Sequence, residues 1–159
     1  MNILGRMIMR RIREIMGTPV LNQKTGAQMG HVKDLIIDDQ ANRLIGIILE
    51  TDSLFSGGSP GILRQDLVQI NDDFIVADCS GSPELRGNSW LEKSGGTVYN
   101  CDGTVKGCIV DVFLDEGWQE ILGYELSDGL FADLLNGRQA ILEKNILLEG
   151  KDVIVIEGG

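Results

Sequence analysis

The feature that most constrains this chain is an internal repeat. The stretch from Thr25 to Gly46 recurs from Asp102 to Gly123 at an offset of about 77 residues, and its glycines, aspartates and apolar positions stay in register. Self-similarity at one fixed spacing predicts two copies of the same small domain. The repeated positions that we expect to determine the fold are Gly26, Gly30, Asp34, Gly46, Gly103, Gly107, Asp111 and Gly123.

Each copy consists of short apolar runs separated by turn residues, and no long helical periodicity is present. This pattern is typical of an all-β sandwich or barrel, and it predicts two tandem small antiparallel β-barrels. We expect a basic N-terminal segment that packs on the first domain, and a linker rich in Gly, Ser and Pro between the domains. The expected boundaries are 1–14 for the basic segment, 15–80 for the first domain, 81–88 for the linker and 89–159 for the second domain.

The charge is distributed unevenly along the chain, whose net charge at pH 7 is −10. Residues 1–14 contribute +3, whereas residues 15–88 and 89–159 contribute −5 and −8. Acidic domains repel phosphate backbones, which argues against nucleic acid as the main partner except through the basic segment. An alternative for that segment is a short amphipathic helix that contacts a membrane surface or a partner.

The cysteines and the apolar runs indicate where the protein resides. Three cysteines, Cys79, Cys101 and Cys108, are too few and too scattered for a disulfide framework. The N-terminal stretch lacks the features of a secretion signal. The apolar runs all fall short of the roughly 18–20 residues that a membrane span requires. The sequence therefore predicts a cytoplasmic protein without a membrane span.

The motif of the first copy reads GTPV, then TGAQMGHVKDLIID and, after an apolar strand, LVQINDDFIV. It resembles the PRC-barrel domain, a small β-barrel shared by the cytoplasmic part of the photosynthetic reaction-centre H subunit and the C-terminal part of a bacterial ribosome maturation factor. The second copy departs from the motif at Thr97, which replaces Pro19, and at Cys108, which follows the second glycine. Its ending is nevertheless similar to that of bacterial tandem PRC-barrel proteins. The resemblance implies docking and assembly, and it carries over no catalytic residue.

Patterns that would support catalysis or metal binding are incomplete. Gly57–Gly61 fits the G-x-S-x-G elbow of hydrolases, but the residue after the serine is Pro60, which has no N–H group for an oxyanion hole. His31 with Cys101 and Cys108 lacks the ligand number and spacing of a zinc site. We therefore predict no catalytic residue, no cofactor and no metal site, and a protein that is not an enzyme.

The duplicated Asp34 and Asp111 lie within expected strands, where aspartate is disfavoured. The apolar pattern changes phase once near Lys33 and Asp34, which predicts a β-bulge. We expect each carboxylate to accept backbone N–H groups at this bulge or at a neighbouring turn. The alternative is that the two aspartates line a small-ligand or metal site between the domains.

Large apolar residues recur in the Gly-containing loop that follows the third strand of each copy. They either close the barrel ends and pack the copies together, or form an exposed contact patch. As the candidate partner-binding residues we name Leu54, Phe55, Leu130, Phe131, Leu134 and Leu135.

Taken with the resemblance, these loops favour a non-catalytic protein-binding or assembly module that binds a protein partner or itself, as a homodimer. Two alternatives remain open. One is a small-ligand or metal-binding protein with its site between the barrels. The other is a ribosome or RNA-processing accessory factor that acts through its Arg-rich N-terminus.

Overall fold

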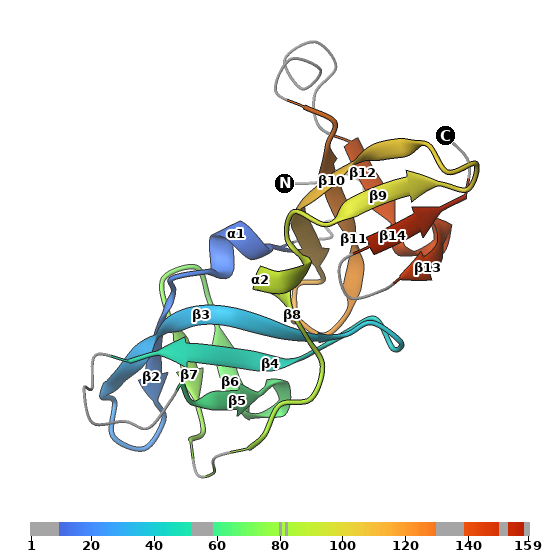
Figure 1. Cartoon of the computed structure of the whole chain (residues 1–159). Helices are drawn as coiled ribbons and strands as arrows, with labels where there is room; N and C mark the ends of the chain where they lie inside the picture. Colours follow the sequence, from blue (N-terminus) through green and yellow to red (C-terminus); the bar gives the residue numbers. More distant parts are fainter. Residues whose placement is uncertain are drawn as a thin grey trace.

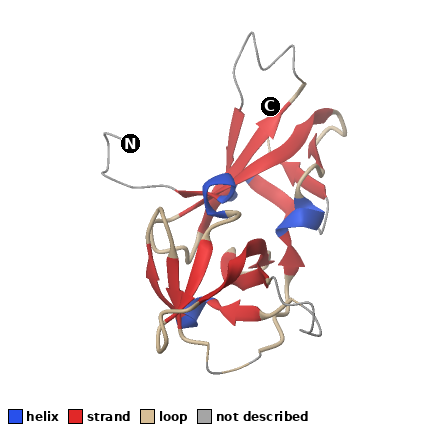
Figure 2. Cartoon of the chain, turned by 90° about the vertical axis from the view of Figure 1, so that its left-hand side faces the viewer, coloured by secondary structure: helices blue, strands red, loops and turns tan. Residues whose placement is uncertain are grey.

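A computed structural model describes residues 10–51, 59–79, 81, 83–129, 139–149 and 153–157. Within these residues the chain forms two seven-stranded sheets, one from each sequence repeat, and only short helices (Figure 1 and Figure 2). The all-β fold with two tandem domains, predicted from the repeat, is confirmed.

The sheet of the first domain has the strand order β5-β4-β3-β2-β7-β6. Neighbouring strands are antiparallel except for β2 and β7, which pair in parallel. A 3₁₀ helix, η1 (Arg64–Asp66), connects β5 to β6. The strands are β2 (Pro19–Asn22), β3 (Gln28–Asp38), β4 (Arg43–Glu50), β5 (Gly61–Leu63), β6 (Leu67–Ile70) and β7 (Ile75–Ala77).

The second domain repeats this plan in the order β12-β11-β10-β9-β14-β13, again with one parallel pair, β9 with β14. The helix η2 (Glu143–Asn145) takes the place of η1. Among the described strands, the two end strands of each sheet do not pair, so each domain is an open sheet by hydrogen bonding. The strands are β9 (Thr97–Asn100), β10 (Val105–Leu114), β11 (Ile121–Ser127), β12 (Gln139–Leu142), β13 (Ile146–Glu149) and β14 (Val153–Ile156).

The longest strand of each sheet contains a bulge at the duplicated aspartate. The pairing of β3 with β4 shifts between Val32 and Asp34, and that of β10 with β11 shifts between Ile109 and Asp111. The bulge predicted from the change of apolar phase is therefore confirmed. A bulge bends its strand and increases the local twist, so the two ends of β3 and β10 pair with different neighbours.

The repeated glycines Gly46 and Gly123 lie where two strand backbones approach each other closely. A Cβ atom at Gly46 would overlap the carbonyl oxygen of Ile62 in β5, and one at Gly123 would overlap that of Ile141 in β12. Only a residue without a side chain allows this approach without displacing the neighbouring strand.

The described part of the N-terminal segment, which begins at Arg10, packs on the second domain, so the expectation that it packs on the first is wrong. Its strand β1 (Arg10–Arg11) pairs with the end of β10, and the helix α1 (Ile12–Ile15) follows directly. The physical reason is that β9 pairs only with the first half of β10, which leaves the backbone of the second half open on that edge.

The first domain is completed in the same way, by the segment that precedes the second domain. The strand β8 (Asn88–Ser89) pairs with the end of β3 in the first domain, and the helix α2 (Trp90–Lys93) follows it. Both helices lie between the two sheets (Figure 1). Each domain is thus completed by a segment that precedes the other domain.

The buried apolar residues form one continuous cluster that extends through both domains. Ile12 and Ile15 of α1 and Trp90 of α2 belong to it, as does Trp118 in the turn between β10 and β11. Domains of about 70 residues bury too little surface to be very stable alone. Here the exchanged segments join the two small cores into a larger one.

Candidate functional site

The domain interface is held by reciprocal contacts between two hairpin turns. The backbone N–H of Leu44 donates to the carbonyl of Gln119 at 3.0 Å, and that of Ile121 donates to the carbonyl of Asn42 at 2.9 Å. The two bonds are equivalent to each other, because Leu44 corresponds to Ile121 and Asn42 corresponds to Gln119 in the repeat. This reciprocity is the contact pattern of a two-fold symmetric dimer, built here within one chain.

Asp34 connects its own bulge to the exchanged helix α2. Its Oδ1 accepts the N–H of Leu35 at 2.8 Å and the N–H of Leu91 at 3.1 Å, and its Oδ2 accepts the hydroxyl of Ser89. The carboxylate is buried. Its oxygens therefore fix the start of α2 on the first domain.

Asp111 makes the equivalent contacts with α1. Its Oδ1 accepts the N–H of Val112 at 2.8 Å and the N–H of Arg13 at 3.4 Å. In addition, the Arg13 guanidinium donates to Asp111 Oδ2 at 2.5 Å and to Glu125 Oε1 at 2.8 Å. The hydrogen bond that Arg13 donates to Asp111 raises the pKa of Arg13 above its usual value.

The structure gives the two repeated aspartates no shared metal site. Each carboxylate is occupied by donors from the strand and helix around it. Among the residues that the structure describes, no group of three or more His, Cys, Asp or Glu side chains is placed to hold a metal ion. None of the helices in the described residues is both long and apolar enough to span a membrane.

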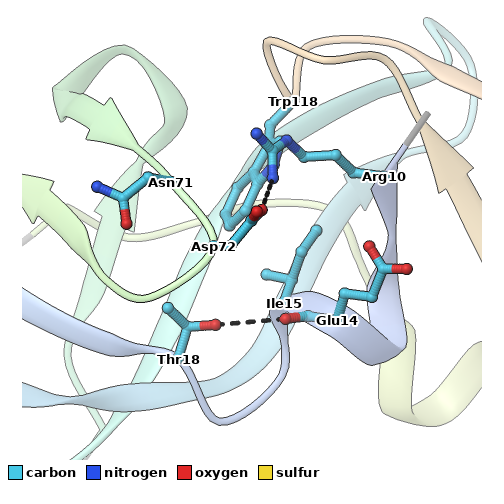
Figure 3. Close-up of a pocket in the computed structure, with 7 residues that line it drawn as sticks. All are labelled: Arg10, Glu14, Ile15, Thr18, Asn71, Asp72 and Trp118. Atoms are coloured by element: carbon cyan, nitrogen blue, oxygen red, sulfur yellow. Dashed lines mark hydrogen bonds and ion pairs between the residues drawn. The ribbon is translucent and has the colours of Figure 1, made fainter. Parts of the chain in front are cut away.

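Two of the crevices at the domain interface lie beside the exchanged helices. The crevice beside α1 has a volume of about 270 Å³ (Figure 3). Across its mouth the Arg10 guanidinium pairs with Asp72 at 2.8 Å. We call it the α1 crevice, and it is lined by Arg10, Glu14, Ile15, Thr18, Asn71, Asp72 and Trp118.

Trp118 has an unusual backbone conformation at the base of the α1 crevice. Its φ of 57° lies in the left-handed region, which is disfavoured for a bulky residue. Arg64 of the first domain donates to the carbonyls of Gly117 at 2.8 Å and Trp118 at 3.2 Å. The buried indole completes the core there, and Arg64 holds the turn against the first domain.

The second crevice lies between the β3–β4 turn of the first domain and β13 of the second, and has a volume of about 250 Å³. Beside it Lys93, the last residue of α2, is fully buried. Its ammonium lies 2.7 Å from Asp39 Oδ1 and 3.3 Å from Glu149 Oε2. We call this the β13 crevice, and it is lined by Asp39, Gln40, Asn42, Ile146, Leu147, Leu148 and Glu149.

Glu149 has a shifted proton affinity in this crevice. Burial, helped by the nearby Asp39 carboxylate, raises the pKa of Glu149 to about 7. Lys93 and Tyr124 oppose that increase, and the ring of Tyr124 lies 5.3 Å from the Lys93 ammonium. The cluster therefore gains or loses a proton near neutral pH.

Two large apolar side chains are exposed next to the β13 crevice. Leu147 is 58% exposed and Leu148 is 59% exposed, and we call this pair the leucine ridge. The ridge lies on β13, the last strand of its sheet among those described. Leu142, at the end of β12, is also exposed.

The sequence predicted a different partner-binding surface, on the loops that follow the third strand of each copy. Their residues lie outside the part of the chain that the structure describes, and they are Leu54, Phe55, Leu130, Phe131, Leu134 and Leu135.

Sequence reasoning missed both the leucine ridge and the charged cluster beside it. One signal was available for the ridge, because adjacent residues of a strand point to opposite faces and Leu147 and Leu148 cannot both face the core. The cluster had no such signal, since Asp39, Lys93 and Glu149 are brought together by the domain interface alone.

Comparison with known proteins agrees with the motifs. The model of the PRC-barrel domain family matches residues 7–78 and again residues 94–159. The chain is 33% identical over 162 residues to the uncharacterized protein YrrD of Bacillus subtilis strain 168, an alignment that covers 94% of this chain and 88% of that protein. The chain therefore belongs to the PRC-barrel domain family and carries two copies of the domain in tandem.

Proposed function

We propose that this chain is a non-catalytic cytoplasmic docking module that binds a protein partner through the leucine ridge of its second domain. The observation that carries the proposal is the exposure of two adjacent leucines, Leu147 and Leu148, on an edge strand beside a crevice. Exposed apolar surface rimmed by polar groups marks interaction sites. An edge strand can also accept an added strand from a partner.

The first domain supports the proposal by contrast. Its strand β6 occupies the place of β13, and the positions of Leu147 and Leu148 are taken there by Val68 and Gln69. Val68 is exposed as well, but it lacks an apolar neighbour at the next position. A wholly structural role would not require two leucines in the second copy alone.

The repeated aspartates support a role without catalysis. The carboxylate oxygens of Asp34 and Asp111 accept hydrogen bonds from backbone N–H groups and from donors of the exchanged segments. A general acid or base would need an oxygen free to reach a substrate. We assign these two residues to holding the domains together.

The test is capture of a partner by the full chain and by three matched variants. We expect a defined protein to cross-link to the wild type and to Val68→Ser, and to be lost with Leu147→Ser/Leu148→Ser. Because these side chains are exposed, each substitution should change stability by less than about 0.5 kcal/mol, and circular dichroism melting checks this. Equal capture by all chains would contradict the proposal.

The same experiment tests the loops predicted from the sequence. Phe55→Ser/Phe131→Ser is the third variant. Loss of the partner with this variant alone would move the docking surface from the leucine ridge to the loops. Light scattering of the wild type and of Leu147→Ser/Leu148→Ser, each measured alone, shows whether the leucine ridge binds a second copy of the chain rather than a different protein.

A further inference from the structure

The charges around the β13 crevice do not balance. The side chains of Asp39 and Glu149 are 5% and 8% exposed, and that of Lys93 is 1% exposed. Two buried carboxylates thus share one ammonium group. Charge that is buried without a partner is costly, so the cluster favours the uptake of one more positive charge.

Glu149 is the place where that charge would bind. Lys93 forms its short contact with Asp39, and neither carboxylate oxygen of Glu149 accepts a hydrogen bond of good geometry from the described residues. Asp39 is further satisfied by the side-chain amide of Asn88. A proton neutralises Glu149 in the absence of a partner, and a cation with N–H donors would also satisfy its lone pairs.

The crevice lies beside this carboxylate, whose two oxygens are buried, so an entering side chain reaches it by displacing part of the crevice wall. Both acidic residues line its wall, together with the amide-bearing Gln40 and Asn42. Its volume of about 250 Å³ equals several water molecules at about 30 Å³ each. The apolar stem of a lysine or arginine would pack along the leucine ridge while its charged end reaches Glu149.

The neighbouring edge strand favours a polypeptide as the source of that side chain. An extended segment that pairs with β13 projects alternate side chains to one side, so that one enters the crevice. The net charge of −10 attracts a basic segment and repels an acidic one.

We propose that the β13 crevice binds the lysine or arginine side chain of a basic, extended segment of the partner protein. This inference rests on the proposed docking function and specifies the chemistry of the partner. The α1 crevice is an internal control, because Ile15, which lines it, corresponds to Lys93, and Ile70, next to its lining residue Asn71, corresponds to Glu149.

The experiment uses the full chain and four synthetic nine-residue peptides of alternating valine and threonine, whose central residue is Lys, Arg, Gln or Glu. Binding is measured by fluorescence anisotropy at pH 8. We expect the Lys and Arg peptides to bind at least about tenfold more tightly than the Gln peptide, and the Glu peptide most weakly. Glu149→Gln should abolish this preference, whereas Asp72→Asn in the α1 crevice should preserve it.

Three outcomes overturn the inference. The first is equal binding of all four peptides, or no binding at millimolar concentration, by the wild-type chain, which requires no variant to fold. The second is an unchanged preference for basic peptides in Glu149→Gln. The third is a wild-type dimer that dissociates in Glu149→Gln, because this result assigns the crevice to a second copy of the chain.

The proposed function can survive such a failure. If Leu147→Ser/Leu148→Ser still loses the cellular partner while the peptides show no charge preference, the ridge docks a partner of different chemistry. If the ridge variant keeps its partner, the docking function itself fails.

Discussion

The α1 crevice and the β13 crevice lie beside corresponding helices, α1 and α2, but differ in chemistry. In the first, Ile15 packs in a core completed by Trp118. In the second, the matching helix ends in Lys93, which pairs with Asp39 and Glu149. The reciprocal backbone contacts are common to both sides of the interface, whereas the side chains beside them differ.

The difference also extends to the exchanged segments. Arg11 and Arg13 of the N-terminal segment form ion pairs with Glu125 at 2.8 Å. The corresponding residues before the second domain, Ser89 and Leu91, contact Asp34 without any charge of their own. At these positions one exchanged segment is held by partly exposed ion pairs, and the other by hydrogen bonds from uncharged donors to the Asp34 carboxylate.

The largest expected effect comes from making the β13 crevice resemble the α1 crevice at one position. Lys93→Ile leaves Asp39 and Glu149 buried without their ammonium, so we expect the free energy of unfolding to fall by about 3–5 kcal/mol. Urea unfolding at pH 8, above the pKa of about 7 of Glu149, measures the change.

The double variant Lys93→Ile/Glu149→Ile is the matched control for that experiment. It removes one carboxylate together with the ammonium, and replacing a buried ion pair by apolar residues is often nearly neutral. We expect it to recover at least half of the lost stability. If the single variant is as stable as the wild type, the charged cluster does not hold the domains together.

A smaller effect is expected from the repeated aspartates, which also differ in their charged partners. Asp34→Ala and Asp111→Ala each leave backbone N–H groups unsatisfied, which costs about 1–3 kcal/mol. Only Asp111 pairs with a guanidinium, that of Arg13. Since salt screens an exposed charge pair, 1 M NaCl should reduce the cost of Asp111→Ala and leave that of Asp34→Ala nearly unchanged. Equal salt effects in urea unfolding would contradict this distinction.

The sequence was informative wherever a pattern is local. The repeated glycines and aspartates predicted two domains, and the phase change at Asp34 predicted the bulge in β3. The bulge follows from the alternation of side chains along a strand, and the two domains follow from the recurrence of one such local pattern at a fixed spacing.

The packing of each exchanged segment on the domain that it does not directly precede was not predictable in the same way. Because the two copies share one pattern, Arg10–Arg11 fits the open edge of β3 or of β10 equally well by sequence. The choice depends on the length of chain between the elements and on the joint core of α1 and α2. The partners of Lys93 were hidden for the same reason, since Asp39 precedes it by 54 residues and lies in the other domain.

The smallest expected effect is the pH dependence of the β13 cluster, measured as the difference in stability between the wild type and Glu149→Gln. The groups that face Glu149 are Asp39, Lys93 and Tyr124. Burial raises the pKa of Glu149 from 4.5 to about 7, so the unfolded chain releases this proton before the folded chain does. Stability linked to Glu149 must then fall as pH rises from about 4.5 to 7 and stay constant above.

Glu149→Gln does not titrate at this position, while the other carboxylates are common to both chains. The variant should therefore gain stability relative to the wild type between pH 5 and 7.5, as urea midpoints would show. A gap that stays constant with pH would mean that Glu149 remains ionised throughout this range.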